Sequence, residues 1–189
     1  MIIRILSILL ASITLAVPSW SQNFSRTEIF GGYSMTHDRI NTLSGWNAQG
    51  TINLTKWIGI TADFAGYYEG KTTDLGLSIW TTERSLHTFT AGPRLSYRSS
   101  KFTPFVHVLI GAARSGGTGT LTFPNFPSVP PASLSGSDYS FAMLTGGGVD
   151  VALNRRFALR PAQVDWLLIR SGGQNWHRLR YSAGIVVRF

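Results

Sequence analysis

The stretch RYSAGIVVRF, residues 180–189, decides the fold because every second residue along it has the same character. One face carries the apolar and aromatic residues Tyr181, Ala183, Ile185, Val187 and Phe189. The opposite face begins with Arg180 and ends with Arg188. A period of two is typical of a β-strand whose two faces meet different surroundings. The stretch therefore predicts a strand that separates an apolar environment from a polar one.

The same alternation recurs along the rest of the chain in runs of about ten residues or more. Runs of this length suit tilted membrane-spanning strands better than the strands of soluble sheets, which average five or six residues. We expect eight strands, at residues 27–36, 45–55, 57–68, 84–97, 102–114, 139–153, 157–170 and 176–189.

The predicted connections alternate between short and long. Short turns are expected at residues 55–56, 98–101 and 154–156, and longer loops at 37–44, 69–83, 115–138 and 171–175. Short periplasmic turns and longer external loops are typical of bacterial outer-membrane barrels. The sequence therefore predicts an all-β fold, an eight-stranded antiparallel up-and-down transmembrane β-barrel formed by residues 22–189.

Residues 1–21 have the pattern of a secretory signal peptide. Arg4 precedes an uncharged stretch from Ile5 to Val17, which is too short to span a bilayer, and small residues surround the expected cleavage site after Ser21. The chain contains no cysteine, so a disulfide scaffold and thiol chemistry are not expected. We expect an exported protein of the outer membrane that carries no cofactor.

The net charge of +8 comes from cations scattered singly or in pairs through the strand patterns. No basic arm or nucleic-acid motif accompanies them, so a nucleic-acid partner is not expected. Anionic head groups of outer-membrane lipid and lipopolysaccharide are the better electrostatic partner. We expect a monomer that contacts these lipids.

The interior of an eight-stranded barrel is narrow enough for side chains to fill. Charges there need partners, because an unpaired buried charge is costly. We expect an interior ion-pair network of Glu28, Asp63, Arg94, Asp150, Arg160, Asp165 and Arg180. Arg160 and Asp165 can both face inward only if the strand changes phase between them, and Pro161 predicts a bulge there. A soluble lipocalin-like ligand binder, which would bury its apolar face inward, remains an alternative.

Aromatic residues gather near both ends of the predicted strands. Near the loop ends lie Trp46, Tyr67, Tyr68, Tyr139, Phe141, Trp176 and Tyr181, and near the turn ends lie Trp57, Tyr97, Phe102, Phe157 and Phe189. Two belts of amphipathic rings are expected where a barrel crosses the two membrane interfaces.

Four stretches together resemble the small OmpA/OmpX-like outer-membrane β-barrel family: FGGYS (30–34), FTPFVHVLIGA (102–112), TGGGVDVALNRRFALRPAQVDWLL (145–168) and the terminal RYSAGIVVRF. The resemblance spans residues 24–189. We expect a structural or surface-interacting role, with adhesion as one form, and no catalysis. The resemblance implies that Tyr181, Ile185, Val187 and Phe189 form the signal that the barrel-assembly machinery reads in the last strand.

Other functions are kept as alternatives. Some barrels of this size modify lipid A with a histidine and a hydroxyl group, and Ser85 and His87 share one strand face here. A narrow pore is a further alternative within the membrane. For surface binding, the best candidate is the loop at 115–138 with its exposed rings Phe123 and Phe126, which could contact an extracellular partner.

Overall fold

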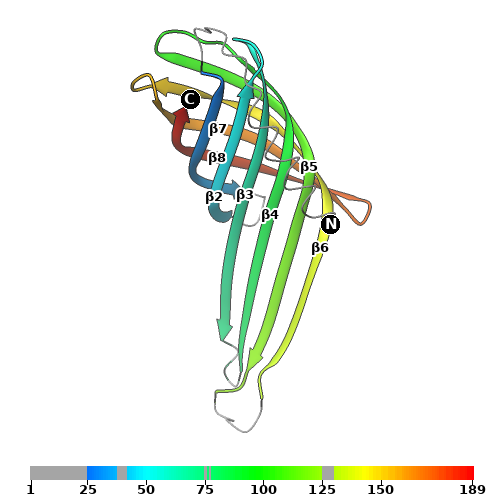
Figure 1. The fold of residues 1–189 in the computed structure, drawn as a ribbon. Coiled ribbons are helices and arrows are strands. Elements are labelled where there is room, and N and C mark those ends of the chain that lie inside the picture. Colours follow the sequence, from blue (N-terminus) through cyan, green and yellow to red (C-terminus); the bar gives the residue numbers. More distant parts are fainter. Residues whose placement is uncertain (1–24, 38–41, 75, 77, 125–129) are drawn as a thin grey trace, which may run out of the picture.

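The computed structural model describes residues 25–37, 42–74, 76, 78–124 and 130–189. Over these residues the chain forms one closed antiparallel barrel in which each strand pairs with its sequence neighbours and β1 pairs with β8 (Figure 1). The strands are β1 Thr27–His37, β2 Thr42–Asn53, β3 Ile58–Asp74, β4 Ile79–Ser96, β5 Phe102–Thr122, β6 Ala132–Ala152, β7 Phe157–Ser171 and β8 Gln174–Arg188. The predicted fold class is confirmed. The described ranges include no helix that is long and apolar enough to cross a bilayer.

The alternation of the sequence becomes an alternation between the outer wall and the interior. On β3 the side chains of Ile58, Ile60 and Phe64 point outward and are 44%, 52% and 37% exposed. Thr61 and Asp63, between them, are buried inside the barrel. The polar face is therefore the inner one, which is the reverse of the lipocalin-like alternative.

Three of the connections agree with the sequence and lie at one end of the barrel, which we call the turn end. The chain turns at residues 54–57, 97–101 and 153–156. Asn154 fixes the last of these turns, because its side-chain oxygen accepts hydrogen bonds from the backbone N–H groups of Arg156 and Phe157 at 2.8 and 2.7 Å. Such side-chain to backbone bonds are a usual way for Asn to stabilise a tight turn.

The predicted loops at 69–83 and 115–138 are mostly wrong, because strands continue into them. β3 and β4 pair as far as Asp74 and Ile79, and β5 and β6 pair as far as Leu121 and Ala132. These segments are rich in Gly, Ser and Thr, which suggested loops, but the ladder hydrogen bonds of the neighbouring strands continue through them. Figure 1 shows the result as a four-stranded sheet that projects far beyond the rest of the barrel.

This projecting sheet consists of residues 69–74, 79–85, 115–122 and 132–138. β3 pairs with β2 only as far as Tyr68, and β6 pairs with β7 only from Phe141 onward. The part of β5 beyond Arg114 extends for roughly 26 Å at about 3.3 Å per residue. The edges of the sheet therefore pair with no further strand in the described ranges, although at its base Ser171 Oγ donates to Asp138 Oδ2 at 3.1 Å.

The predicted loops at 37–44 and 171–175 are also shorter than expected. β1 reaches His37 and β2 begins at Thr42. Between β7 and β8 only Gly172 and Gly173 remain, with φ angles of 56° and 78°. Positive φ at both central positions is the requirement of a two-residue hairpin turn that favours glycine.

The bulge predicted at Pro161 is confirmed. The pairing of β7 with β8 changes register between Arg160 and Gln163, and the pairing of β6 with β7 changes between Val149 and Val151. The phase change brings Arg160, Gln163 and Asp165 all into the interior. At Pro93 the register is the same on both sides, since Ala91 pairs with Ile110 and Arg94 with His107.

The turn-end belt is exposed on all five predicted rings, and the loop-end belt departs at two positions. Tyr67 is 0% exposed inside the barrel, where its hydroxyl lies 3.1 Å from Ser34 Oγ. Trp176 lines a hollow at the loop-end mouth together with Leu43 and Arg178. Both predictions were wrong because strand-end position alone does not fix which face a ring occupies.

Candidate functional site: the polar interior

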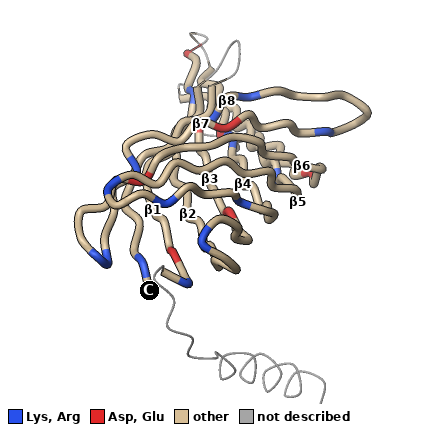
Figure 2. Tube along the Cα trace, turned by 90° about the horizontal axis from the view of Figure 1, so that it is seen from above, with Lys and Arg blue, Asp and Glu red and all other residues tan. Residues whose placement is uncertain are grey.

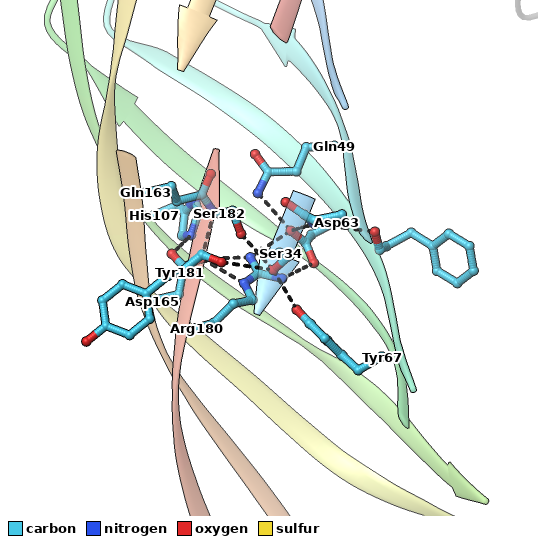
Figure 3. Close-up of polar contacts among 12 residues, drawn as sticks. Ser34, Gln49, Asp63, Tyr67, His107, Gln163, Asp165, Arg180, Tyr181 and Ser182 are labelled. Atoms are coloured by element: carbon cyan, nitrogen blue, oxygen red, sulfur yellow. Dashed lines mark hydrogen bonds and ion pairs between the residues drawn. The ribbon is translucent and has the colours of Figure 1, made fainter. Parts of the chain in front are cut away.

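Arg180 of β8 occupies the middle of the barrel between two carboxylates (Figure 3). Its Nη1 and Nη2 donate to the two oxygens of Asp63 on β3, each at 2.8 Å. Its Nε donates to Asp165 Oδ2 on β7, also at 2.8 Å. All three side chains are fully buried. Because the Asp63 contact is bidentate, it fixes the orientation of the guanidinium as well as its charge.

Asp165 has further partners that surround its carboxylate. His107 Nε2 lies 2.9 Å from Asp165 Oδ1, and Gln163 Nε2 donates to Oδ2 at 2.6 Å. The backbone of β6 leaves room for this carboxylate only because residue 146 is glycine, since a Cβ there would overlap Asp165 Oδ1 and the Val164 carbonyl. We call Asp63, His107, Asp165 and Arg180 the central cluster.

A second group of charges, the turn-end cluster, consists of Glu28, Arg94, Asp150 and Arg160. Asp150 Oδ1 accepts from Arg160 Nε at 2.6 Å, and Asp150 Oδ2 accepts from Arg94 Nη2 at 3.0 Å. Glu28 lies 3.7 Å from Arg94 Nη2 and 2.8 Å from Nη1 of Arg98 in the turn between β4 and β5. The four members of the cluster are at most 2% exposed.

Two glutamines join the clusters. Arg160 Nη1 donates to Gln49 Oε1 at 2.6 Å and to Gln163 Oε1 at 2.7 Å. The amide nitrogens of the same glutamines donate to Asp63 and Asp165, at 2.7 and 2.6 Å. Each glutamine thus accepts from a cation and donates to an anion, so the interior is one connected hydrogen-bond network.

Aromatic rings contact both arginines of the turn-end cluster. The guanidinium carbons of Arg94 and Arg160 lie 3.8 and 4.4 Å from the centroid of the Phe105 ring. Phe30 covers Arg160 from another side at 4.3 Å. Cation–π contact of this kind is favourable for desolvated guanidinium groups.

Apolar side chains close the interior on both sides of the network. Toward the loop end, buried contacts join Leu43, Ala65, Tyr67, Leu86, Leu109, Ala113, Ala142, Leu144, Leu167 and Ile169. Toward the turn end, Phe30, Ala158 and Val186 form a smaller cluster. The arrangement of the described interior is that of a packed core rather than of a water-filled channel.

The structure therefore places all seven charged residues named from the sequence inside the barrel, but in two clusters. The predicted network did not include His107, Gln49 and Gln163, which complete the hydrogen bonds. It also missed Arg98 and the 3.7 Å approach of Arg188 to Glu28. The signal for Gln49 was present, since it shares the inward parity of Asn47 and Asn53 on β2.

The other candidate residues lie apart from the network. Ser85 and His87 are on the outer face of β4, and the His87 ring contacts the Tyr68 hydroxyl at 3.1 Å. Tyr181, Ile185 and Phe189 are 41%, 54% and 67% exposed on β8 and just after it, and Val187 is half-buried. In the part of the chain that the structure describes, no three His, Asp or Glu side chains come together as metal ligands would.

Most of the expected binding loop belongs to the hairpin of β5 and β6. Phe123 follows the end of β5 and is half-buried. Phe126 lies outside the described residues.

No family model and no curated protein matches the sequence. Among solved structures, Ail, the attachment invasion locus protein of Yersinia pestis, aligns with 88% of this chain and 99% of its own at 16% identity and a TM-score of 0.56. Ail in complex with the heparin analogue sucrose octasulfate gives 15% identity, a TM-score of 0.56 and coverage of 86% and 97%. Neisserial surface protein A gives 13% identity, a TM-score of 0.45 and coverage of 86% and 96%. The fold is that of a small outer-membrane β-barrel.

Proposed function

We propose that this chain is a non-catalytic, monomeric outer-membrane protein of the OmpA/OmpX-like type that interacts with an extracellular surface through its projecting sheet. The observation that carries the proposal is that β3–β6 continue beyond the barrel as a sheet with exposed apolar side chains near its tip. A protein that only filled the membrane would not need this sheet.

The outer wall supports a place in the membrane. Large apolar side chains are exposed around the barrel between the two aromatic belts. They are Ile29, Ile52, Ile60, Phe64, Phe89, Val106, Val108, Ile110, Leu159, Val164 and Ile185. On β3 this apolar band runs from Ile58 to Tyr68, a length that suits a tilted membrane-spanning strand. Outer-membrane lipid and lipopolysaccharide are the partners that such a wall requires, and cleavage of residues 1–21 during export is part of the same proposal.

The apolar side chains near the end of the projecting sheet form what we call the tip patch: Trp80, Leu121 and Leu134. Trp80 pairs with Leu121 across β4 and β5, and the Trp80 ring lies against Gly119, which pairs with Leu134 on β6. Trp80 is 40% exposed and Leu134 is 79% exposed. Exposed apolar residues that gather on one face mark an interaction surface better than scattered ones do.

The charges of the projecting sheet favour a protein surface over a polyanion as the partner. Its cations are Lys71 and Arg84, with Arg114 at its base, and its carboxylates are Glu69, Asp74, Glu83 and Asp138. A heparin-like ligand, which one Ail complex contains, would need a clear excess of cations. Apolar anchors within a nearly neutral sheet suit a protein partner instead.

Replacement of Trp80 and Leu134 by serine tests the role of the tip patch. Bacteria that display the W80S/L134S variant should bind epithelial monolayers several-fold more weakly than bacteria that display the unchanged protein, at equal surface levels. The matched control is T81A/S133A, which alters the opposite face of the same strands. If bacteria with either variant bind cells as well as bacteria with the unchanged protein, the proposed protein partner is wrong. It is also wrong if bacteria with the unchanged protein bind immobilised heparin as well as they bind cells.

The location is tested separately. The protein should sediment with outer membranes, require detergent for extraction, and migrate differently on gels before and after boiling, as folded barrels do. Recovery of the processed protein in the soluble periplasmic fraction would contradict the membrane proposal.

Recognition of β8 by the barrel-assembly machinery is the last part of the proposal. The exposed side chains of Tyr181, Ile185 and Phe189 support it, and the backbone of Phe189 also bonds to Thr27 and Arg26 across the seam with β1. Phe189→Ala keeps those backbone bonds and removes only the ring. We expect F189A to lower the assembled fraction without lowering synthesis or export, as measured by pulse-chase labelling, while F102A, which removes another exposed belt ring, should not.

A further inference from the structure

The turn end of the barrel carries a strong excess of positive charge. Its cations are Arg26, Lys56, Arg98, Lys101, Arg155, Arg156 and Arg188. Within the described ranges, the two carboxylates nearest to this end are Glu28 and Asp150, which are 2% and 0% exposed. Figure 2 looks onto this end, where several turns near the C-terminus are blue. The projecting sheet at the other end has no such imbalance.

Part of this charge surrounds a cavity of about 450 Å³, which we call the turn-end mouth. Three arginines reach it from three separate segments: Arg98 from the β4–β5 turn, Arg155 from the β6–β7 turn and Arg188 from β8. Hydroxyl and amide groups complete the polar lining, from Ser25, Ser99, Ser100, Thr103 and Asn154. No carboxylate is among the residues that line it.

One carboxylate, that of Glu28, lies behind the lining, and its single negative charge does not neutralise the nearby arginines. Glu28 Oε1 lies 2.8 Å from Arg98 Nη1 and 3.7 Å from Arg188 Nε, and the same side chain also lies near Arg94. Arg188 is 9% exposed, and its Nε and Nη2 are buried without a hydrogen-bond partner in the described structure. Glu28 Oε1 makes no hydrogen bond at these distances either, and a buried guanidinium normally has its donors satisfied, so Arg188 keeps donors for an acceptor in the mouth.

The position of the mouth identifies the kind of anion. Leu153, which lines the mouth, is 65% exposed and has the outward parity of Val149 and Val151 on β6. Backbone hydrogen bonds join two lining residues to the turn-end belt, because the N–H groups of Leu153 and Ser99 donate to the carbonyls of Phe157 and Phe102, each at 3.0 Å. The mouth thus joins the aromatic belt, where lipid head groups meet a barrel, and short turns face the periplasm.

We propose that the turn-end mouth binds the phosphate group of an anionic phospholipid from the periplasmic leaflet. The guanidinium groups of Arg98, Arg155 and Arg188 would hold the phosphate, with serine hydroxyls as further donors, and Leu153 would contact the glycerol and acyl region. Bidentate guanidinium contacts are well suited to phosphate oxygens. The inference rests on the proposed membrane location and goes beyond it, because an ordinary lipid-facing wall needs no preference for lipid charge.

Native mass spectrometry of the purified full chain, released from nanodiscs, tests this site. With nanodiscs of equal phosphatidylglycerol and phosphatidylcholine, the unchanged protein should retain phosphatidylglycerol preferentially. Arg155→Gln should lower this preference about fivefold, the factor that corresponds to about 1 kcal/mol per basic residue at an anionic surface. Arg188→Gln should lower the preference for phosphatidylglycerol by a similar factor. If loss of the Arg188 contact with Glu28 impairs folding, Arg155→Gln still tests the site, because it leaves that contact in place.

Arg170→Gln is the matched control, because it removes the same charge from an exposed residue near the loop end of β7. Equal retention of the two lipids by the unchanged protein would overturn the inference, and so would equal losses in R155Q and R170Q. A third measurement adds inorganic phosphate to the protein. If phosphate binds while the protein shows no preference for phosphatidylglycerol, the mouth binds free phosphate and the proposed lipid site is wrong. A chain that fails to insert into nanodiscs at all would instead count against the proposed membrane function.

Discussion

Each of the strands β3–β6 runs without a break from the barrel into the projecting sheet and keeps the same alternation of side chains. The two parts differ in the surroundings of the inward-facing side chains. In the barrel that face buries Asp63, Arg94 and Asp150, each with a charged partner at 3.0 Å or less. In the projecting sheet the same face carries Trp80 and Leu134, which are exposed. Strand pattern alone therefore does not determine burial, because closure of the barrel buries one stretch and leaves the other in water.

This comparison suggests a division of roles. The closed part holds side chains whose loss leaves buried charges unpaired, so it should dominate the free energy of unfolding. The projecting part has few buried contacts to lose and should contribute to binding instead. Three changes test this division, beginning with the largest expected effect.

Arg180→Leu should be the most damaging single substitution. It leaves Asp63 and Asp165 facing each other in the interior without the cation that bridges them. We expect the free energy of unfolding to fall by about 3–5 kcal/mol, the usual cost of breaking a buried ion pair from one side. Urea unfolding of the protein in detergent micelles, followed by tryptophan fluorescence, would measure it.

The control for that substitution is Arg170→Leu, because Arg170 is exposed on β7. It should change the free energy of unfolding by no more than about 0.5 kcal/mol. Equal stability of R180L and R170L would mean that the interior network does not stabilise the barrel.

Gln163→Leu should have an intermediate effect, because it removes one of the two glutamines that join the clusters. Arg160 Nη1 would keep Gln49 Oε1, and Asp165 would keep Arg180, so a loss of about 1–2 kcal/mol is expected. In Q49L/Q163L the Arg160 Nη1 group loses both amide oxygens. The double variant should therefore lose more than the sum of the single losses, by about 0.5–2 kcal/mol. A strictly additive cycle would show that the glutamines act independently.

Replacement of residues 117–136 by a short Gly-Ser linker should have the smallest effect on stability. The removed segment lies wholly in the projecting sheet and its connection. We expect the free energy of unfolding to change by less than about 1 kcal/mol, because loop closure depends only weakly on length. Cell binding should nevertheless be lost with Leu121 and Leu134. A large loss of stability would show that the sheet supports the barrel and would remove the distinction between the two parts.

Much of the barrel could be predicted from the sequence because the outer wall and the interior of such a fold favour opposite polarities on alternate residues. The alternation of Thr61 and Asp63 with Ile60 and Phe64 determined the inward face of β3. The position of Pro161 between Arg160 and Asp165 predicted the bulge, because both charges need the interior and proline cannot take part fully in the ladder. Each of these inferences depended on a property of a single residue, namely its polarity or, for proline, its missing N–H group.

The projecting sheet and the complete network could not be predicted in the same way. Thr81 and Gly117 become strand residues through pairing with Thr120 and Arg84, which are more than 30 positions away in sequence. On β5 both faces look apolar, because Phe105 and Leu109 share the face of His107 while Val106 and Val108 form the other, so periodicity did not mark this histidine as an interior residue. Its role depends on Asp165, a contact between residues 58 positions apart.

The seam between β1 and β8 has a consequence for the timing of folding. Thr27 and Phe189 bond to each other across this seam, so the sheet cannot close until the ribosome has supplied its last strand. Contacts in helical proteins are mostly local and can form early, but here the closing contact joins Thr27 to Phe189, at opposite ends of the barrel sequence. Until then the polypeptide is an open, unclosed chain, so protection from aggregation over that period is a requirement of the topology itself.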